Sequence, residues 1–222
     1  MLKLCNATIK NQQRIITFPD LCLNVGEIVG LSGPSGCGKS TLAMALAGMQ
    51  SLHSGSIARP KVATHNSANK NRPNSVQWVC QQPEFAFNPL WTLHKSMTES
   101  HPIDEAQLAR YQIDPSWLKR YPKELSGGEL QRLNLVRALA PDTRYLLCDE
   151  ITAQLDTLTQ QDIWQALCAE VDRGQLGLLV ISHDEYLLDA ICDRVIKFGT
   201  SAEVPMIATE PVSNPSWRAV LN

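Results

Sequence analysis

Hydrophobic positions along the chain predict strands at the start and strands alternating with helices in the second half. Residues 2–25 alternate enough to predict two strands joined by a turn at Asn11-Gln12-Gln13. Short apolar runs at residues 27–32, 145–149 and 178–181 are typical of buried strands. Because the later runs alternate with helix-forming segments, they predict parallel pairing. The pattern therefore predicts an α/β fold.

The middle of the chain changes character and predicts a helical insert between two α/β pieces. Residues 92–100 and 103–111 have helical patterns, and Asp114-Pro115 is typical of a helix start. We expect residues 1–200 to form one domain, with a helical subdomain inserted at about residues 88–126. The segment 201–222 is expected to be a short C-terminal tail in loop or partial order.

Two further segments between the predicted elements are expected to be irregular. Gly55 predicts a turn after the first helix. Residues 59–75 are polar, with four Asn and two Pro, and predict a surface loop.

A glycine-rich loop lies between a predicted strand and a predicted helix, the setting that a phosphate-binding loop needs. Its glycines let backbone N–H groups turn toward phosphate oxygens, and the helix N-terminus adds partial positive charge. Lys39 can reach the β- and γ-phosphates, and the Ser40 hydroxyl can bind Mg²⁺. The residues expected to bind ATP are Gly33, Pro34, Ser35, Gly36, Cys37, Gly38, Lys39, Ser40 and Thr41.

Composition removes several classes of function. The chain has 222 residues and a net charge of −2, so no overall basic field recruits nucleic acid, and we expect no nucleic-acid partner. No apolar run approaches the roughly 20 residues of a membrane span. The seven cysteines are odd in number and show no C-x-x-C spacing, which favours reduced thiols in a cytosolic protein.

Three more motifs follow the glycine-rich loop. The stretch Leu125, Ser126, Gly127, Gly128, Glu129 precedes an apolar-periodic helix at residues 130–140. Asp149 and Glu150 end a buried strand, where a carboxylate is costly unless a cation or partner is near. His183 follows another buried strand, at the edge of the sheet where ligands bind in α/β proteins.

In this order the motifs resemble those of the ATP-binding-cassette (ABC) ATPases, over about residues 2–198. The resemblance implies a P-loop NTPase (RecA-like) core, an N-terminal antiparallel β subdomain and a small inserted α-helical subdomain. It also implies ATP hydrolysis with ATP and Mg²⁺ as cofactors.

The resemblance implies a role for each motif residue. Glu150 matches the catalytic carboxylate, His183 the switch histidine and Gln81 the Q-loop glutamine, with Gln82 as the alternative ligand. The metal would be held by Ser40, Gln81 and Asp149. The signature, residues 125–129, would close over ATP bound by a second ABC ATPase subunit in a head-to-tail homodimer or heterodimer. Asp156 matches the D-loop, although it can equally be only a helix N-cap.

The chain departs from the family pattern at three positions. The region Ile9-Lys10-Asn11-Gln12 lacks the aromatic residue that usually stacks on adenine, so adenine is held weakly or Arg14 stacks instead. Ile151 follows the catalytic carboxylate, where proline is usual. The D-loop reads Ala-Gln-Leu-Asp instead of the more usual Ser-Ala-Leu-Asp.

Two segments resemble the oligopeptide, dipeptide and nickel importer branch: residues 81–92 and residues 121–125. The resemblance implies the ATPase subunit of a bacterial importer for peptides or metal chelates, on the cytoplasmic face of the inner membrane. Its partners would be two transmembrane permease subunits and, indirectly, a substrate-binding protein. The alternatives are a soluble, non-transport ABC ATPase and an ATP-sensing cassette with little hydrolysis.

Overall fold

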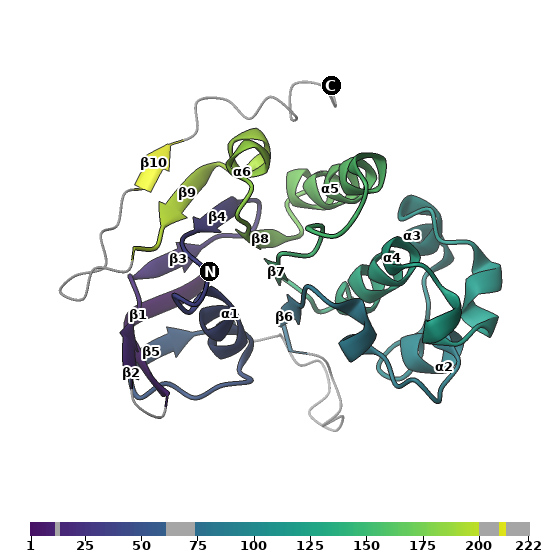
Figure 1. Cartoon of the computed structure of the whole chain (residues 1–222), viewed down its shortest axis with the longest axis horizontal. Coiled ribbons are helices and arrows are strands. Elements are labelled where there is room, and N and C mark those ends of the chain that lie inside the picture. Colours follow the sequence, from purple (N-terminus) through teal and green to yellow (C-terminus); the bar gives the residue numbers. More distant parts are fainter. Residues whose placement is uncertain (12–13, 61–73, 200–208, 212–222) are drawn as a thin grey trace.

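The computed structural model describes residues 1–11, 14–60, 74–199 and 209–211. Two sheets form its core, and a group of helices lies to one side of them (Figure 1). The strands are β1 (Leu2–Asn11), β2 (Arg14–Thr17), β3 (Leu21–Leu23), β4 (Ile28–Ser32), β5 (Ser54–Ala58), β6 (Val76–Val79), β7 (Tyr145–Asp149), β8 (Gly177–Ile181), β9 (Arg194–Lys197) and β10 (Thr209–Pro211). The α-helices are α1 (Lys39–Ala47), α2 (Leu93–Met97), α3 (Glu105–Arg110), α4 (Gly127–Ala138), α5 (Thr157–Asp172) and α6 (Glu185–Ile191).

The N-terminal sheet is antiparallel, as expected, but its strands differ from those predicted. Strand β1 pairs with β2, β3 and β5, so residues 2–25 contain three strands instead of two. The predicted turn at residues 11–13 falls partly on residues outside the described part. Gly55 lies in β5 and not in a turn, opposite an irregularity between Cys5 and Thr8. A Cβ at Gly55 would lie 2.3 Å from the Asn6 carbonyl oxygen, so only glycine fits this close approach.

The second sheet has the strand order β10-β9-β4-β8-β7-β6, and its five strands other than β10 are parallel. Alternate residues of these strands point to opposite faces. Leu147 and Leu179 pack with α1 and the antiparallel sheet, whereas Cys148 and Val180 pack with α4, α5 and α6. Helices α1 and α4 therefore cover opposite faces of the parallel sheet.

The helical region, residues 83–138, connects β6 to β7 (Figure 1). Helices α2 and α3 are shorter than predicted, and the Asp114-Pro115 start leads into a 3₁₀ helix, Pro115–Lys119. Two more 3₁₀ helices lie at Pro83–Ala86 and Pro122–Glu124. Helix α4 begins at Gly127, because Ser126 caps it.

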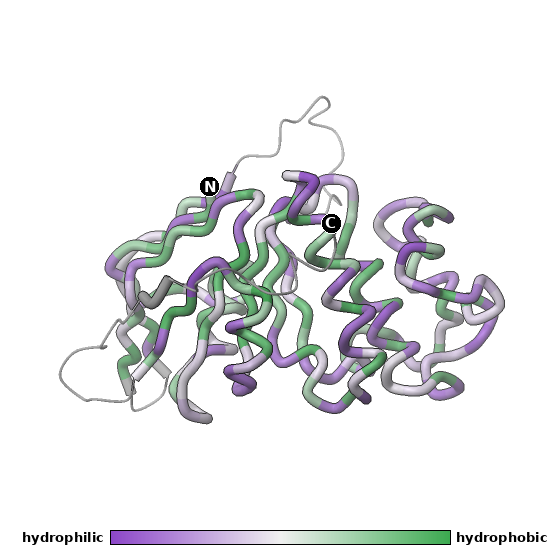
Figure 2. The backbone as a smooth tube through the Cα atoms, turned by 90° about the horizontal axis from the view of Figure 1, so that it is seen from above, coloured by the Kyte–Doolittle hydropathy of each residue, from purple (hydrophilic) through white to green (hydrophobic). Residues whose placement is uncertain are grey.

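Hydrophobic stretches run through the central strands of the molecule (Figure 2). The predicted surface loop is described only at its two ends, because residues 61–73 lie outside the described part. The predicted tail contains one element, β10, which pairs antiparallel with β9. Residues 209–211 thus belong to the parallel sheet's edge and not to a separate tail.

Candidate active site

The glycine-rich loop leaves β4 at Ser32 and enters α1 at Lys39. Gly36 and Gly38 have φ angles of 77° and 108°, a region that favours glycine. Gly33 has a φ of 155°, and a Cβ there would lie 2.3 Å from the Phe198 carbonyl oxygen. The loop therefore depends on glycine for both its backbone path and its contact with the end of β9.

Lys39 is buried and its ammonium group lies against the loop that precedes it. Its Nζ donates to the carbonyl oxygens of Gly33 at 2.8 Å and Pro34 at 3.0 Å. The charge is thus held beside the loop's backbone instead of extending into solvent. A phosphate in the loop would meet this charge together with the N-terminus of α1.

Asp149 ends β7 with its carboxyl group buried next to the glycine-rich loop. Burial raises the pKa of this carboxyl, and the Ser40 hydroxyl, the Trp78 indole and the Lys39 ammonium oppose that rise. Asp149, more than a hundred residues from Lys39 and Ser40 in the sequence, is therefore their neighbour in the fold. A buried carboxylate beside a hydroxyl suits a hard cation.

The side chains of Glu150 and His183 are in contact at the carboxyl edge of the parallel sheet. The His183 Nε2 lies 2.8 Å from the Glu150 Oε1. The pairing follows from register, because Asp149 lies opposite Ile181 in neighbouring parallel strands. Glu150 has a φ of 53°, a left-handed conformation rare for residues other than glycine. Its backbone N–H donates to the Ile181 carbonyl at 3.0 Å, which holds that conformation.

Gln81 follows β6, the strand beside β7, and its side chain is exposed. It therefore lies at the same edge of the sheet as Asp149. Gln82 is also exposed, and its carbonyl accepts from the Cys80 thiol at 3.2 Å. Within the described residues, no side-chain contact distinguishes Gln81 from Gln82 as a ligand.

The signature residues open helix α4 through reciprocal capping. The Ser126 hydroxyl accepts from the Glu129 N–H at 3.3 Å, and the Ser126 N–H donates to the Glu129 carboxylate at 2.7 Å. Gly127 is exposed, with open space where a Cβ would lie. Leu125, before the cap, packs against the core.

A signature hollow of about 430 Å³ lies between the start of α4 and the start of α5. Its lining includes Ser126, Gly127, Gly128, Leu155 and Asp156. Asp156 caps α5, because its carboxylate accepts from the Thr159 N–H at 3.0 Å and hydroxyl at 2.7 Å. Those hydrogen bonds lower the pKa of Asp156. Asp156 is therefore the N-cap of α5, and this position is also compatible with a D-loop role.

The structure brings some predicted residues together and separates others. Lys39, Ser40, Asp149, Glu150 and His183 gather at the carboxyl edge of the parallel sheet. The signature lies on α4, on the opposite face of that sheet from α1. One chain therefore presents two separate groups of motifs.

Phe18 directly follows β2 and stacks on Phe198 with ring centroids 5.7 Å apart. Ile16 lies over Gly38, 3.2 Å from the position of a Cβ there. The side chain of Arg14, the suggested adenine partner, lies outside the described part. The Phe18 ring lies 3.5 Å from the same Cβ position at Gly38, so Ile16 and Phe18 together give the loop an apolar surface.

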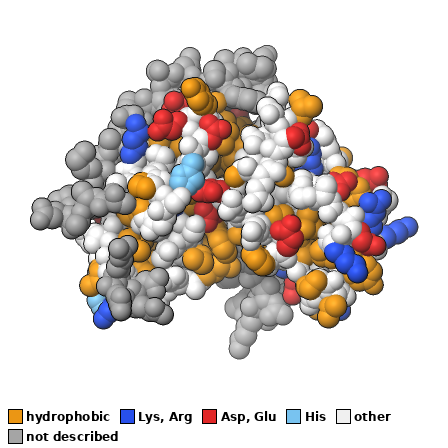
Figure 3. Space-filling model, viewed as in Figure 1, with side chains coloured by type: hydrophobic (Ala, Val, Ile, Leu, Met, Phe, Trp, Pro, Cys, Tyr) orange, Lys and Arg blue, Asp and Glu red, His pale blue; other side chains and the backbone are white. Residues whose placement is uncertain are grey.

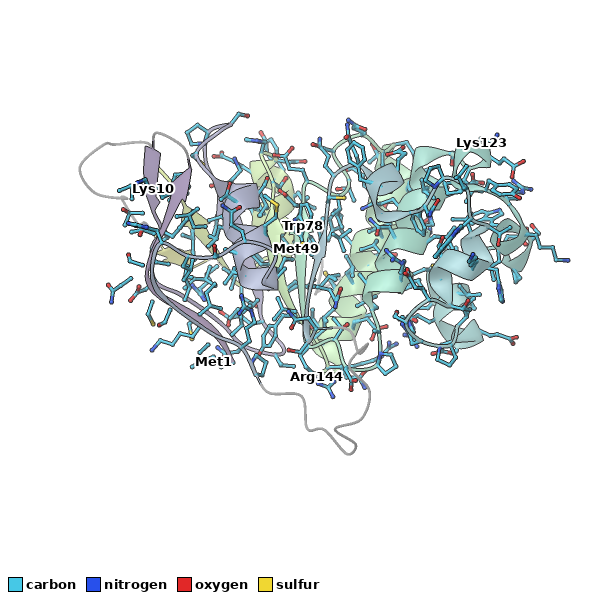
Figure 4. The ribbon with its side chains drawn as sticks, turned by 90° about the horizontal axis from the view of Figure 1, so that it is seen from below. Met1, Lys10, Met49, Trp78, Lys123 and Arg144 are labelled. Carbon is cyan, nitrogen blue, oxygen red and sulfur yellow. The ribbon has the colours of Figure 1, made fainter. Side chains whose placement is uncertain are left out.

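Sequence reasoning missed a groove of about 750 Å³ between the sheet and the helical region. Its lining includes Met49, Trp78 and Cys80 on the sheet side, and Phe85 and Arg137 on the helical side. Figure 4 shows Met49 and Trp78 close together between the two parts. These residues share no sequence motif, since they meet only through folding.

Charges on the face seen in Figure 3 are mixed in sign. Acidic side chains spread across the middle of this face, while Lys and Arg gather mainly at its right, over the helical region. No helix in the described ranges is long and apolar enough to cross a membrane. Within those ranges, no cluster of three or more His, Cys, Asp or Glu forms a ready metal site.

Comparison with known proteins agrees with this geometry. The family model described as ABC transporter matches residues 18–153. The chain belongs to the ABC transporter family. It is the ATP-binding cassette of that family, an ATPase.

Relatives of this ABC cassette include the nickel import system ATP-binding protein NikE of Staphylococcus aureus strain N315, 30% identical over 96% of this chain and 93% of the relative. NikE of the bovine strain RF122 is 31% identical over 88% and 85%. A solved bacterial ABC transporter cassette, MJ0796, in dimeric form, superposes with a TM-score of 0.76 at 23% identity, covering 96% of this chain and all of that one. An ATP-binding subunit of another ABC transporter superposes with a TM-score of 0.72 at 18% identity, over 89% and 85%.

Proposed function

We propose that this cassette hydrolyses Mg·ATP to power a bacterial importer for peptides or nickel chelates. The observation that carries the ATPase part is the gathering of Lys39, Asp149 and the Glu150–His183 pair at one edge of the sheet. The similarity to nickel import proteins supports the importer part.

The glycine-rich loop, residues 33–41, binds the phosphates of ATP. Its backbone N–H groups and the N-terminus of α1 attract the negative charge. Lys39 then exchanges its hydrogen bonds to Gly33 and Pro34 for bonds to the phosphates. Because the ammonium is already buried and hydrogen-bonded within the loop, it does not have to be removed from water before it binds phosphate.

Glu150 polarises the attacking water, and His183 orients Glu150. The 2.8 Å contact between their side chains fixes the carboxylate oxygen that faces His183, which leaves the other for water. The left-handed backbone at Glu150 costs about 1–3 kcal/mol, and such strain is typical of functional sites. His183 is half-exposed at its side chain, so it is also accessible to the γ-phosphate.

The residues at the end of β7 fit a magnesium ion. Ser40 and Asp149 would hold it, with Gln81 approaching from the end of β6. Few protein ligands are needed, because Mg²⁺ keeps several waters and binds substrate phosphates. When bound, the ion would neutralise charge on the phosphates and on the buried Asp149 carboxylate.

A second cassette completes the site. The signature hollow presents backbone N–H groups at the start of α4, on the face of the sheet opposite the chain's own phosphate loop. A head-to-tail pair would place the hollow of each cassette over the ATP of the other. The dimeric form of the solved cassette MJ0796 supports this arrangement.

The groove between the sheet and the helical region receives the permease. Phe85 and Met49 at its rim are 81% and 67% exposed, an apolar surface suited to a protein partner. We place this cassette on the cytoplasmic face of the inner membrane, held there by its two permease subunits, with the substrate-binding protein a more distant partner.

Lys39→Ala tests the ATPase part directly. Loss of the ammonium should reduce Mg·ATP hydrolysis by about 100-fold or more and weaken ATP binding by about tenfold. Steady-state phosphate release and titration with a fluorescent ATP analogue measure the two effects. Lys3→Ala, at an exposed position of β1, is the matched control. Hydrolysis at the wild-type rate in Lys39→Ala would contradict the assignment of residues 33–41 as the phosphate-binding loop.

Co-purification with a permease tests the importer part. The cassette, produced in the cells it comes from, should be recovered in the membrane fraction, and Phe85→Asp should release it into the soluble fraction. Recovery of wild-type cassette only as a soluble protein would contradict the transporter role and favour a non-transport ATPase.

A further inference from the structure

Residues 150–156 connect the end of β7 to the start of α5 through turns and bends. Two backbone hydrogen bonds close these turns. The Ala153 N–H donates to the Glu150 carbonyl at 3.2 Å, and the Leu155 N–H donates to the Thr152 carbonyl at 3.1 Å. Both bonds stay within the segment, so they do not attach it to the helices around it.

Thr152 is the point at which α5 holds this segment. The Thr152 hydroxyl accepts from the Trp164 indole N–H at 3.1 Å, and the Thr152 carbonyl accepts from the Gln160 side-chain amide at 2.8 Å. The same Gln160 nitrogen donates to the Leu155 carbonyl at 3.2 Å. Gln160 and Trp164 are four residues apart on α5, so they lie on one face of that helix. One helix face therefore binds both the side chain and the backbone of Thr152.

The hydrogen bond between Thr152 and Trp164 is buried. Thr152 is 4% exposed and Trp164 is 3% exposed. A buried donor or acceptor that loses its partner is costly, because water cannot take the partner's place. The bond therefore fixes the side chain of Thr152 more firmly than an exposed bond would.

Thr152 lies two residues after Glu150, whose backbone has a φ of 53°. A residue other than glycine keeps such a conformation only where the surrounding structure holds it. The Ile181 carbonyl holds Glu150 through its N–H, from the side of the sheet. The hydrogen bonds from α5 hold the chain on the other side of Glu150, through Thr152.

A hollow of about 220 Å³ places the same side chains beside the Glu150–His183 contact. Its lining includes Thr152, Gln160 and Trp164 together with Glu150 and His183. The side chains that hold the segment and the side chains at the carboxyl edge of the sheet therefore border one space.

We propose that Gln160 and Trp164 are positioning residues for ATP hydrolysis: through Thr152 they hold the turn after Glu150, and so fix where its carboxylate meets the attacking water. The inference rests on the proposed function, because it assumes that Glu150 acts on that water. A carboxylate that polarises water must lie within hydrogen-bonding distance of it, and a displacement of about 1 Å can cost about 100-fold in rate.

Thr152→Val is the first test, because it keeps the branched side chain and removes the hydroxyl. The kcat of ATP hydrolysis should fall about five- to twentyfold, since the catalytic carboxylate is less well placed. The KM for ATP should stay within about twofold of wild type, because the phosphate loop lies between β4 and α1 and keeps its contacts. Thr152→Ser keeps the hydroxyl and should restore kcat to within about twofold of wild type. A purely structural role would give the opposite order, because serine removes a buried methyl group that valine keeps.

Trp164→Phe removes the other partner of the same hydrogen bond and keeps an aromatic ring. Its kcat should fall in the same range, again with little change in KM. The double variant Thr152→Val, Trp164→Phe should lose no more than the larger single loss, because both changes remove one shared interaction. Losses that multiply would contradict the proposal. Trp91→Phe, under Lys95 on the helical side, is the matched control and should leave kcat unchanged.

Gln160→Leu supplies a readout that does not depend on turnover. Loss of the amide frees two carbonyls, so amide hydrogen exchange in residues 150–156 should speed up by about tenfold while exchange in β7 stays unchanged. Gln161→Leu is the control, because neighbouring positions on a helix do not face the same side. Equal exchange in the two variants would overturn the role of Gln160 even if the substitutions at Thr152 or Trp164 failed to fold.

The outcomes separate this inference from the proposed function. An unchanged kcat in folded Thr152→Val and Trp164→Phe, beside an inactive Glu150→Gln, contradicts only the positioning role. A KM that rises as much as kcat falls also contradicts it, because such a result indicates general damage to the nucleotide site. Hydrolysis at the wild-type rate in Glu150→Gln would contradict the proposed function itself.

Discussion

At the scale of single residues, the site combines groups whose environments oppose folding. Glu150 adopts a left-handed backbone, Asp149 carries a buried carboxyl, and Gly33 leaves no room for a side chain. Such residues lower stability in exchange for function, so their substitution should change stability in predictable directions.

Asp149→Asn should stabilise the metal-free cassette at neutral pH. Burial raises the carboxyl's pKa above its unfolded value, so ionisation costs stability above the folded pKa. Below the unfolded pKa the group is protonated in both states, and the cost vanishes. In EDTA, the melting temperature of Asp149→Asn should exceed that of wild type at about pH 8, and the gap should close toward about pH 4. Asp189→Asn, exposed on α6, is the control. A gap that widens as pH falls would contradict this account.

Gly33→Ala should destabilise the cassette by about 2 kcal/mol or more, since the new Cβ would clash with the Phe198 carbonyl. The gap of 2.3 Å is below any real Cβ contact, so either the loop or the end of β9 must move. Denaturant unfolding measures the loss. Gly199→Ala, which has open space and is exposed, should cost little. Equal stability of the two variants would show that the loop does not pack against Phe198.

At the scale of elements, helix α4 joins the signature to the groove. Ser126 caps its start, and Arg137 near its end reaches back across the helical region. The Arg137 guanidinium donates to the Ala86 carbonyl at 2.7 Å and to the Ser96 carbonyl at 3.3 Å, and pairs with Glu99 at 3.0 Å. One side chain thus links α4 with α2 and with the 3₁₀ helix after β6.

Arg137→Ala should loosen those contacts without unfolding the core. Amide hydrogen exchange in residues 83–99 should speed up by about tenfold, because charged hydrogen bonds to two carbonyls are lost. Exchange in β7 and β8 should stay unchanged. Arg173→Ala, which removes a half-exposed guanidinium from its ion pair with the buried Glu170, is the control and should not affect residues 83–99. Uniform acceleration across the chain would mean that Arg137 supports global stability instead.

At the scale of the whole molecule, sequence patterns predicted the central strands of the parallel sheet and the loops that follow them. They predicted the short strands β3, β5 and β10 less well. The strand before Gly33, the helix after it and the strands carrying Asp149 and preceding His183 were predicted, because buried runs and glycines mark them locally. Strands β3 and β5 were missed, since they are short and are stabilised by pairing with β1 across a long sequence separation. Strand β10 was missed because it is only three residues long and is stabilised by pairing with β9.

The site was predictable to the extent that motifs mark it. The Glu150–His183 contact follows from two motifs at the ends of neighbouring strands. Trp78, Met49 and Arg137 belong to no motif, and only their meeting at the groove gives them a role. Contacts between elements far apart in sequence leave no local pattern to read.

In the proposed mechanism, two cassettes close head to tail over ATP before hydrolysis. Glu150→Gln should still bind ATP, because the phosphate loop is intact. It should not hydrolyse ATP, because the amide cannot polarise the attacking water. The closed pair should then accumulate. Ser126→Arg in the same background should bind ATP as a monomer, because the arginine fills the signature hollow that faces the partner's nucleotide.

Size-exclusion chromatography with light scattering, in Mg²⁺, tests whether ATP brings two cassettes together. We predict that Glu150→Gln elutes as a dimer with ATP and as a monomer with ADP. The double variant Glu150→Gln, Ser126→Arg should remain a monomer with either nucleotide. A Glu150→Gln cassette that binds ATP yet stays monomeric, or a double variant that still dimerises with ATP, would contradict the account.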